Sequence, residues 1–173
     1  MSKGEPKPPY LNLSPVVGKS GGSLTITLPP YYDMLLGTAE GAYEDSQYPI
    51  AVVVAQMAFE ARVEDAFTTA YVATFTGEAP INEMVNALPD RSMMDRRCRE
   101  LWQALTGDDI KKAPARAWPR YHQHVERRNT LAHGGLPCGK KEARASLDAV
   151  RDLVAHLDSV IEGMADRLDA ANA

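Results

Sequence analysis

Cysteine is scarce in this chain, and its two examples are far apart. Among 173 residues only Cys98 and Cys138 occur, and neither lies in a CxxC or Cys/His ligand spacing. A chain of this length can bury a core without covalent staples, so a disulfide framework is unnecessary. We therefore expect reduced thiols, no metal site and no cofactor.

Long apolar runs are also missing. The first 15 residues lack the apolar segment of a signal peptide, and the longest apolar stretch, residues 50–59, is interrupted by Gln56. That stretch is much shorter than a bilayer span. We expect a cytoplasmic protein without a membrane partner.

An excess of positive charge is absent from the chain as a whole. The net charge of −4 argues against a protein that coats nucleic acid without specificity. The charge is nevertheless uneven, because residues 90–144 are rich in Lys and Arg while the flanking regions are acidic. This basic region is either a solvated helix face or a local phosphate-binding surface.

The N-terminal residues 1–46 differ in composition from the rest. Prolines punctuate two alternating stretches, residues 11–17 and 24–28, and Gly18-Lys19-Ser20-Gly21-Gly22 lies between them. This pattern predicts a β-hairpin arm. The Gly-Lys-Ser sequence resembles the end of a P-loop, but Leu13 occupies the position of the first glycine.

Residues 47–173 read as an all-α helical bundle. Pro49 suits the first turn of a helix, Gly107 suits a helix end, and Gly134-Gly135 with Pro137 cannot readily continue one. The predicted helices are residues 49–76, 93–105, 119–133 and 140–168, with a short helical turn over 81–88.

The last helix carries a regular heptad pattern. Its apolar positions are spaced alternately by four and three residues: Ala143, Leu147, Val150, Val154, Leu157, Ile161, Met164 and Leu168. Such a seam forms either a bundle core or a helix–helix dimer interface.

The helix over 119–133 places an arginine among its inward positions. Read at heptad spacing, the inward stripe is Trp118, Tyr121, Val125, Arg128 and Ala132. A desolvated guanidinium needs a carboxylate, a phosphate or a subunit interface. Among the carboxylates, which include Glu64, Asp65 and Glu126, we favour Glu60.

The segment Arg128-Asn129-Thr130-Leu131-Ala132-His133 resembles the R-x4-6-H signature of HEPN domains, including the frequent Asn after the Arg. The similarity in element order covers roughly residues 47–170. HEPN domains are helical bundles that dimerise so that the Arg and His of both subunits face one cleft, and many are metal-independent endoribonucleases. Gly135 stands where some members carry a tyrosine, so the tyrosine-dependent chemistry is not expected.

The resemblance implies roles for individual side chains. His133 would move protons, Arg128 would hold the scissile phosphate, Asn129 would orient a partner, and Glu60 completes the predicted catalytic set. Attack by the RNA 2′-hydroxyl would leave a 2′,3′-cyclic phosphate. The predicted RNA-backbone contacts are Arg127, Arg96, Arg97 and Lys140.

The sequence is compatible with three functions. The first is a homodimeric HEPN ribonuclease of a toxin or anti-phage system, with RNA as substrate and a cognate antitoxin or regulatory protein as a further partner. The second is a non-catalytic dimer that binds RNA, a nucleotide or a partner protein. The third is a structural bundle in which Arg128 anchors an internal ion pair. Two other matches to the motif, Arg116–His122 and Arg151–His156, show that the spacing also arises by chance.

Overall fold

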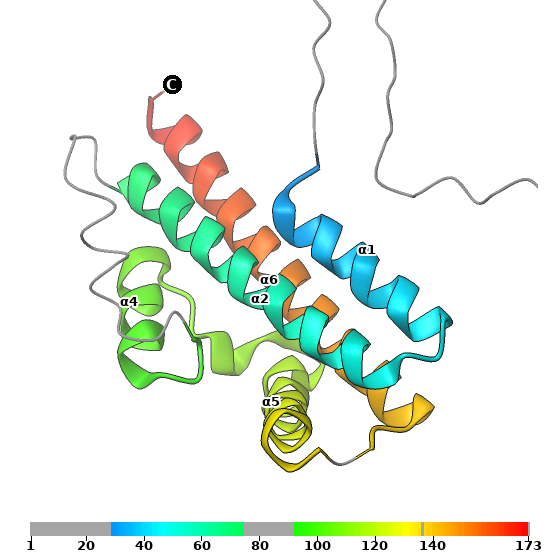
Figure 1. Cartoon of the computed structure of the whole chain (residues 1–173). Coiled ribbons are helices and arrows are strands. Elements are labelled where there is room, and N and C mark those ends of the chain that lie inside the picture. The colour runs from blue at the N-terminus through cyan, green and yellow to red at the C-terminus, as the bar shows by residue number, and fades with distance from the viewer. Residues whose placement is uncertain (1–28, 75–91, 136, 173) are drawn as a thin grey trace, which may run out of the picture.

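A long helix occupies the centre of a helical bundle in the computed structural model, which describes residues 29–74, 92–135 and 137–172. This helix, α2 (Tyr48–Thr74), is apolar around most of its circumference and packs against α1, α4, α5 and α6 (Figure 1). Its one fully enclosed charge, Arg62, lies 2.6 Å from Asp158 of α6 and 2.7 Å from Asp65. These ion pairs offset the cost of burying the guanidinium. The predicted all-α bundle is confirmed.

Helix α1 (Tyr31–Glu44) extends the bundle toward the N-terminus. It runs antiparallel to α2. The tight turn that joins the two helices contains Ser46, which adopts a left-handed backbone conformation with φ of 61°. The bundle thus begins before residue 47, within the segment that we had assigned to the arm. The two strands of the predicted hairpin lie outside the described residues, as does the predicted turn over 81–88.

Helix α4 (Arg96–Thr106) has clear signals at both ends. The Asp95 carboxylate accepts hydrogen bonds from the first-turn N–H groups of Arg97 and Cys98, and Gly107 closes the helix in the left-handed conformation. Two short 3-10 helices, η1 (Ile110–Lys112) and η2 (Pro114–Arg116), then lead to α5 (Ala117–Gly134). The predicted helix over 93–105 is therefore present, and it begins a few residues later than expected.

The connection between α4 and α5 is fastened to the bundle by Asp108. Its carboxylate accepts a hydrogen bond from the indole of the fully buried Trp102 at 2.8 Å and lies 3.1 Å from His156 Nε2 of α6. This arrangement fixes the approach of the chain into α5, the helix that carries the motif.

Helix α6 (Lys140–Asn172) packs against both α2 and α5. Every residue of the predicted seam with a described side chain is buried, except Ile161, which is half-buried. Ser146, Ala149 and Leu153 are buried as well, so α6 has a wider inward face than one seam. Of the two possibilities left open for the seam, the structure shows the bundle core.

Figure 1 shows α1, α2 and α6 running along a common direction, while α5 crosses them and projects its C-terminal end from the bundle. Among the described helices, none is long and apolar enough to cross a membrane. The motif helix is therefore held at one end of a helical core with its last turns accessible.

Candidate functional site

The inward face of α5 is rotated relative to the sequence prediction. Tyr121 and His124 are fully buried, whereas Val125 is half-buried and Ala132 is exposed. The prediction placed apolar Val125 inside and overlooked the polar residue beside it. His124 can be buried because its Nε2 lies 3.0 Å from the side-chain oxygen of Gln56 on α2.

His124 belongs to a polar network between α2 and α5. The amide of Gln56 donates to Glu60 at 2.7 Å and to the Tyr121 hydroxyl at 3.2 Å. Burial, reinforced by the charges of Arg127 and Arg128, lowers the pKa of His124 to about 4. This histidine is therefore neutral at physiological pH, and its Nδ1 is buried without a hydrogen-bond partner among the described residues.

Arg128 lies at the edge of this network, half-buried. Its Nη1 donates to the side-chain oxygen of Asn129 at 3.1 Å, and within the described part of the chain no carboxylate lies within 4.0 Å of it. The expected pair with Glu60 is not formed, since the hydrogen bond of Glu60 goes to Gln56. Half-exposure explains the difference, because water can solvate a guanidinium that is only partly enclosed. Its other N–H donors remain available to an anion.

His133 lies in the last turn of α5 and is exposed. The helix ends immediately afterwards at Gly135, which takes the left-handed conformation with φ of 60° and donates its N–H to the carbonyl of Leu131. Among the described residues, the side chain of His133 makes no hydrogen bond or ion pair. Asn129, one turn earlier and also exposed, lies on a neighbouring face of the helix.

Arg128 and His133 do not point in the same direction within one chain. Five residues at about 100° each separate their side chains by about 140° around the helix axis. Asn129 lies between them on the helix surface and is already bonded to Arg128. A single copy therefore presents a motif whose two ends face different sides of one helix end.

The two other motif matches differ from this one in their contacts. Arg151 lies 2.7 Å from Glu40, and His156 lies 3.1 Å from Asp108. In the remaining match, His122 lies 3.3 Å from Glu126. In each of these two matches at least one member thus has a carboxylate partner. The pair Arg128 and His133 has none in the regions that the structure describes.

The predicted RNA contacts are divided between two parts of the bundle. Arg127 donates to the hydroxyl of the buried Ser146 on α6, and Lys140 is exposed at the start of α6, 6.0 Å from the ring of Tyr43. Arg96 and Arg97 are exposed on α4 instead, where Arg96 lies 3.5 Å from Glu100. Only Arg127 and Lys140 lie on the two helices that flank the end of the motif.

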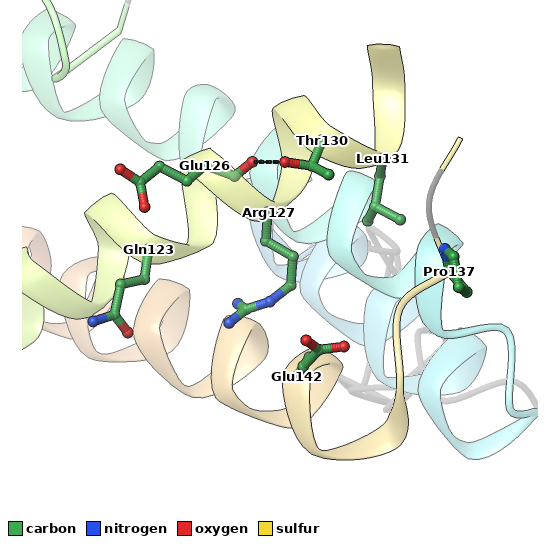
Figure 2. Close-up of a pocket in the computed structure, with 7 residues that line it drawn as sticks. All are labelled: Gln123, Glu126, Arg127, Thr130, Leu131, Pro137 and Glu142. Atoms are coloured by element: carbon green, nitrogen blue, oxygen red, sulfur yellow. Dashed lines mark hydrogen bonds between the residues drawn. The ribbon is translucent and has the colours of Figure 1, made fainter. Parts of the chain in front are cut away.

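A cleft of about 390 Å³ opens between the second half of α5 and the start of α6 (Figure 2). Its polar lining includes Gln123, Arg127 and Glu142, and Leu131 and Pro137 supply apolar surface. Sequence reasoning missed Gln123 and Glu142, because a lone glutamine and a helix-start glutamate carry no pattern. Only the crossing of α5 over α6 brings them together.

The described residues contain no group of three or more His, Cys, Asp or Glu side chains placed to hold a metal ion. Fold and site together define an all-α bundle in which, over the part of the chain that the structure describes, an arginine and a histidine near the C-terminal end of one helix make no ion pair. No protein-family model matches the chain, and no match is found among curated proteins or solved structures.

Proposed function

We propose that this protein is a metal-independent endoribonuclease of the HEPN type. The observation that carries the proposal is the contrast among the three motif matches: within the described residues, Arg128 and His133 form the match in which neither member lies within 4.0 Å of a carboxylate. A guanidinium without a carboxylate partner keeps its N–H donors available to a phosphate, and an exposed histidine without one is accessible to a substrate.

The proposed chemistry uses the nucleophile that RNA carries itself. A histidine can take the proton of the 2′-hydroxyl or return one to the leaving 5′-oxygen, and His133 is exposed enough to do so. The guanidinium of Arg128 would bind the phosphate and stabilise charge in the transition state. Asn129, through its hydrogen bond to Arg128, would hold the guanidinium in place. The products are a 2′,3′-cyclic phosphate and a 5′-hydroxyl.

The proposal includes a homodimer, because the two ends of the motif diverge within one chain. An apolar stripe on α2 offers a surface for the second copy: Ile50 and Met57 are 51% and 45% exposed, and Val53 and Val54 are half-buried on the same side. Glu60 lies at the edge of this stripe, and its carboxylate accepts a hydrogen bond from Gln56, which belongs to the polar network beside Arg128. The proposed dimer is one in which a two-fold contact over the stripe places the Arg of one copy near the His of the other.

Within this proposal, the chain acts as a toxin or in defence against phage. A cognate antitoxin or regulatory protein would then control it, because an unrestrained ribonuclease harms its own cell.

The decisive experiment measures cleavage of total and synthetic RNA in EDTA by the parent protein and its His133→Ala variant. We expect cleavage by the parent only, with cyclic phosphate ends. The matched control is His122→Ala, which removes an exposed histidine from the same helix and should keep the activity. Equal cleavage by the parent and His133→Ala would contradict the proposal.

A second candidate is a non-catalytic dimer that binds RNA, a nucleotide or a partner protein. It is supported by the free N–H donors of Arg128, which suit anion binding with or without cleavage. Absence of cleavage, together with weaker RNA binding by Arg128→Gln, would favour this candidate. Cleavage that depends on His133 would exclude it.

A further inference from the structure

The cleft between α5 and α6 brings a guanidinium and a carboxylate from different helices to one opening. In Figure 2, Arg127 extends from α5 toward α6, and Glu142 extends from the first turn of α6 toward it. Glu126 also borders the cleft, but its carboxylate extends away from Arg127 and lies 3.3 Å from His122. The charged groups that face the opening are therefore one positive and one negative.

Arg127 is held in position from below. Its Nη1 donates to the hydroxyl of Ser146, which is fully buried in α6. No carboxylate lies within 4.0 Å of its guanidinium among the described residues, Glu142 included. A guanidinium has five N–H donors, so most of them remain available to a ligand in the cleft.

Glu142 is held in position as well. Its Oε2 accepts the N–H of Gly139 at 2.9 Å, which fixes the carboxylate at the start of α6. The adjacent thiol of Cys138 responds to both charged groups: burial raises its pKa first, Glu142 raises it further and Arg127 lowers it. A carboxylate accepts at several lone pairs, so one bond to Gly139 leaves acceptor capacity directed at the cleft.

We propose that this cleft binds the guanine base of a ribonucleotide. The Watson–Crick edge of guanine presents two neighbouring N–H donors beside the O6 acceptor, which matches a carboxylate beside a guanidinium. Glu142 accepts from the base N1–H and N2–H, and Arg127 donates to O6. Adenine, cytosine and uracil each lack the pair of adjacent donors, so a carboxylate cannot bind them in the same way.

The remaining lining suits a flat heterocycle. Leu131 and Pro137 provide apolar surface for a base face, and the amide of Gln123 can bond the edge of the base. A volume of about 390 Å³ falls within the usual range of ligand sites.

The cleft lies next to the candidate catalytic end of α5. Thr130 and Leu131 line it, and His133 follows Thr130 by three residues, about 4.5 Å along the helix axis. A base held in the cleft therefore belongs to a nucleotide near the scissile phosphate. A role for the bound guanine in selecting the cleavage site rests on the proposed function. Binding of the base in the cleft does not depend on it.

The test compares GMP with AMP, CMP and UMP on the intact chain by isothermal titration calorimetry. We expect GMP to bind at least about tenfold more tightly than the others. Glu142→Gln should abolish this preference, because its amide N–H₂ opposes the base donors while its oxygen can still accept from Gly139. Glu126→Gln is the matched control and should retain the preference, because the carboxylate of Glu126 is directed away from Arg127.

Equal affinity for the four nucleotides, or a preference that survives Glu142→Gln, would overturn the proposal. If Glu142→Gln does not keep the parent's circular dichroism, Arg127→Gln provides the second test, and it should reduce the affinity for GMP to that for AMP.

The guanine could belong to the RNA strand that is cut or to a free nucleotide, and mapping of RNA cleavage sites distinguishes these two sources. Cuts clustered at a fixed position beside guanines identify a base within the RNA strand, whereas GMP preference with cuts that ignore guanine identifies a free nucleotide. GMP preference without any cleavage would leave the cleft assignment standing and contradict the ribonuclease proposal. Cleavage that requires His133, without a preference for GMP, would support the ribonuclease proposal and contradict the assignment of the cleft to guanine.

Discussion

His124 is the residue whose burial has the clearest energetic consequence. It is fully enclosed, its Nε2 faces Gln56, Tyr121 lies beside it, and Arg127 and Arg128 are the charges that act on it. Its pKa falls from the ordinary 6.5 to about 4 in the folded protein. Between these values the unfolded chain binds more protons than the folded one, so stability decreases as the pH falls.

We predict that the free energy of unfolding drops by about 2 kcal/mol between pH 7 and pH 5 because of this histidine alone. Urea unfolding at the two pH values measures the drop. In His124→Gln the difference between pH 7 and pH 5 should shrink by that amount. In His122→Gln it should remain, because His124 is still present; an unchanged pH dependence in His124→Gln would show that another group is responsible.

The candidate site was only partly predictable at the level of residues. The spacing of Arg128, Asn129 and His133 is visible in the sequence, and the structure leaves this arginine and histidine without carboxylate partners in the described regions. The predicted ion pair between Arg128 and Glu60 was wrong. Heptad spacing predicts the direction of a side chain only to within about one position, and it does not show whether that side chain is fully buried or half-buried. Glu142 was not found, because its approach to Arg127 depends on how two helices cross.

At the scale of elements, the ends of α4, α5 and α6 lie close to their predicted positions because the chain marks them. Gly107 and Gly135 adopt the left-handed conformation that ends a helix, and Asp95 caps the start of α4. Helix α1 was missed because its sequence contains Gly37 and Gly41 and follows two prolines. Such a segment has low intrinsic helix propensity and owes its helix to packing on α2.

Two glycines provide a prediction about helix stability. Gly107→Ala should lower the free energy of unfolding by about 1 kcal/mol, because alanine is strained at its φ of 78°. Gly163→Ala should raise it by about 0.5 to 1 kcal/mol, because this glycine lies inside α6 and an added Cβ meets no atom within 4 Å. Chemical denaturation of both variants measures the two changes, and effects of the same sign would contradict the assigned helix boundaries.

At the scale of the whole molecule, the apolar stripe on α2 determines the assembly that we propose. Met57→Asp places a charge within the stripe, and we expect it to convert a dimer into a monomer with the same helical content. Sedimentation velocity measures the change. RNA cleavage should fall together with dimer content, because the proposed mechanism uses the motif of both copies.

The control for this surface is Val72→Asp, which alters another exposed apolar residue of the same helix, 54% exposed, well beyond the stripe. It should leave the dimer intact. A Met57→Asp variant that remains dimeric, or a parent that is monomeric at the concentrations of the cleavage assay, would refute the proposed interface.

The position of α2 at the centre of the bundle also determines when the protein can fold during its synthesis. This early helix is apolar on most sides, and α6, the last helix described, covers one of those sides. Until the ribosome has released α6, the apolar surface that it covers has no partner and is available to chaperones. Cys98, Trp102 and the motif on α5 emerge earlier than the helix that fixes α5 in place. A nascent chain without α6 lacks the Ser146 contact to Arg127 and the Glu142 side of the cleft, so we expect the cleft to form only after α6 has docked.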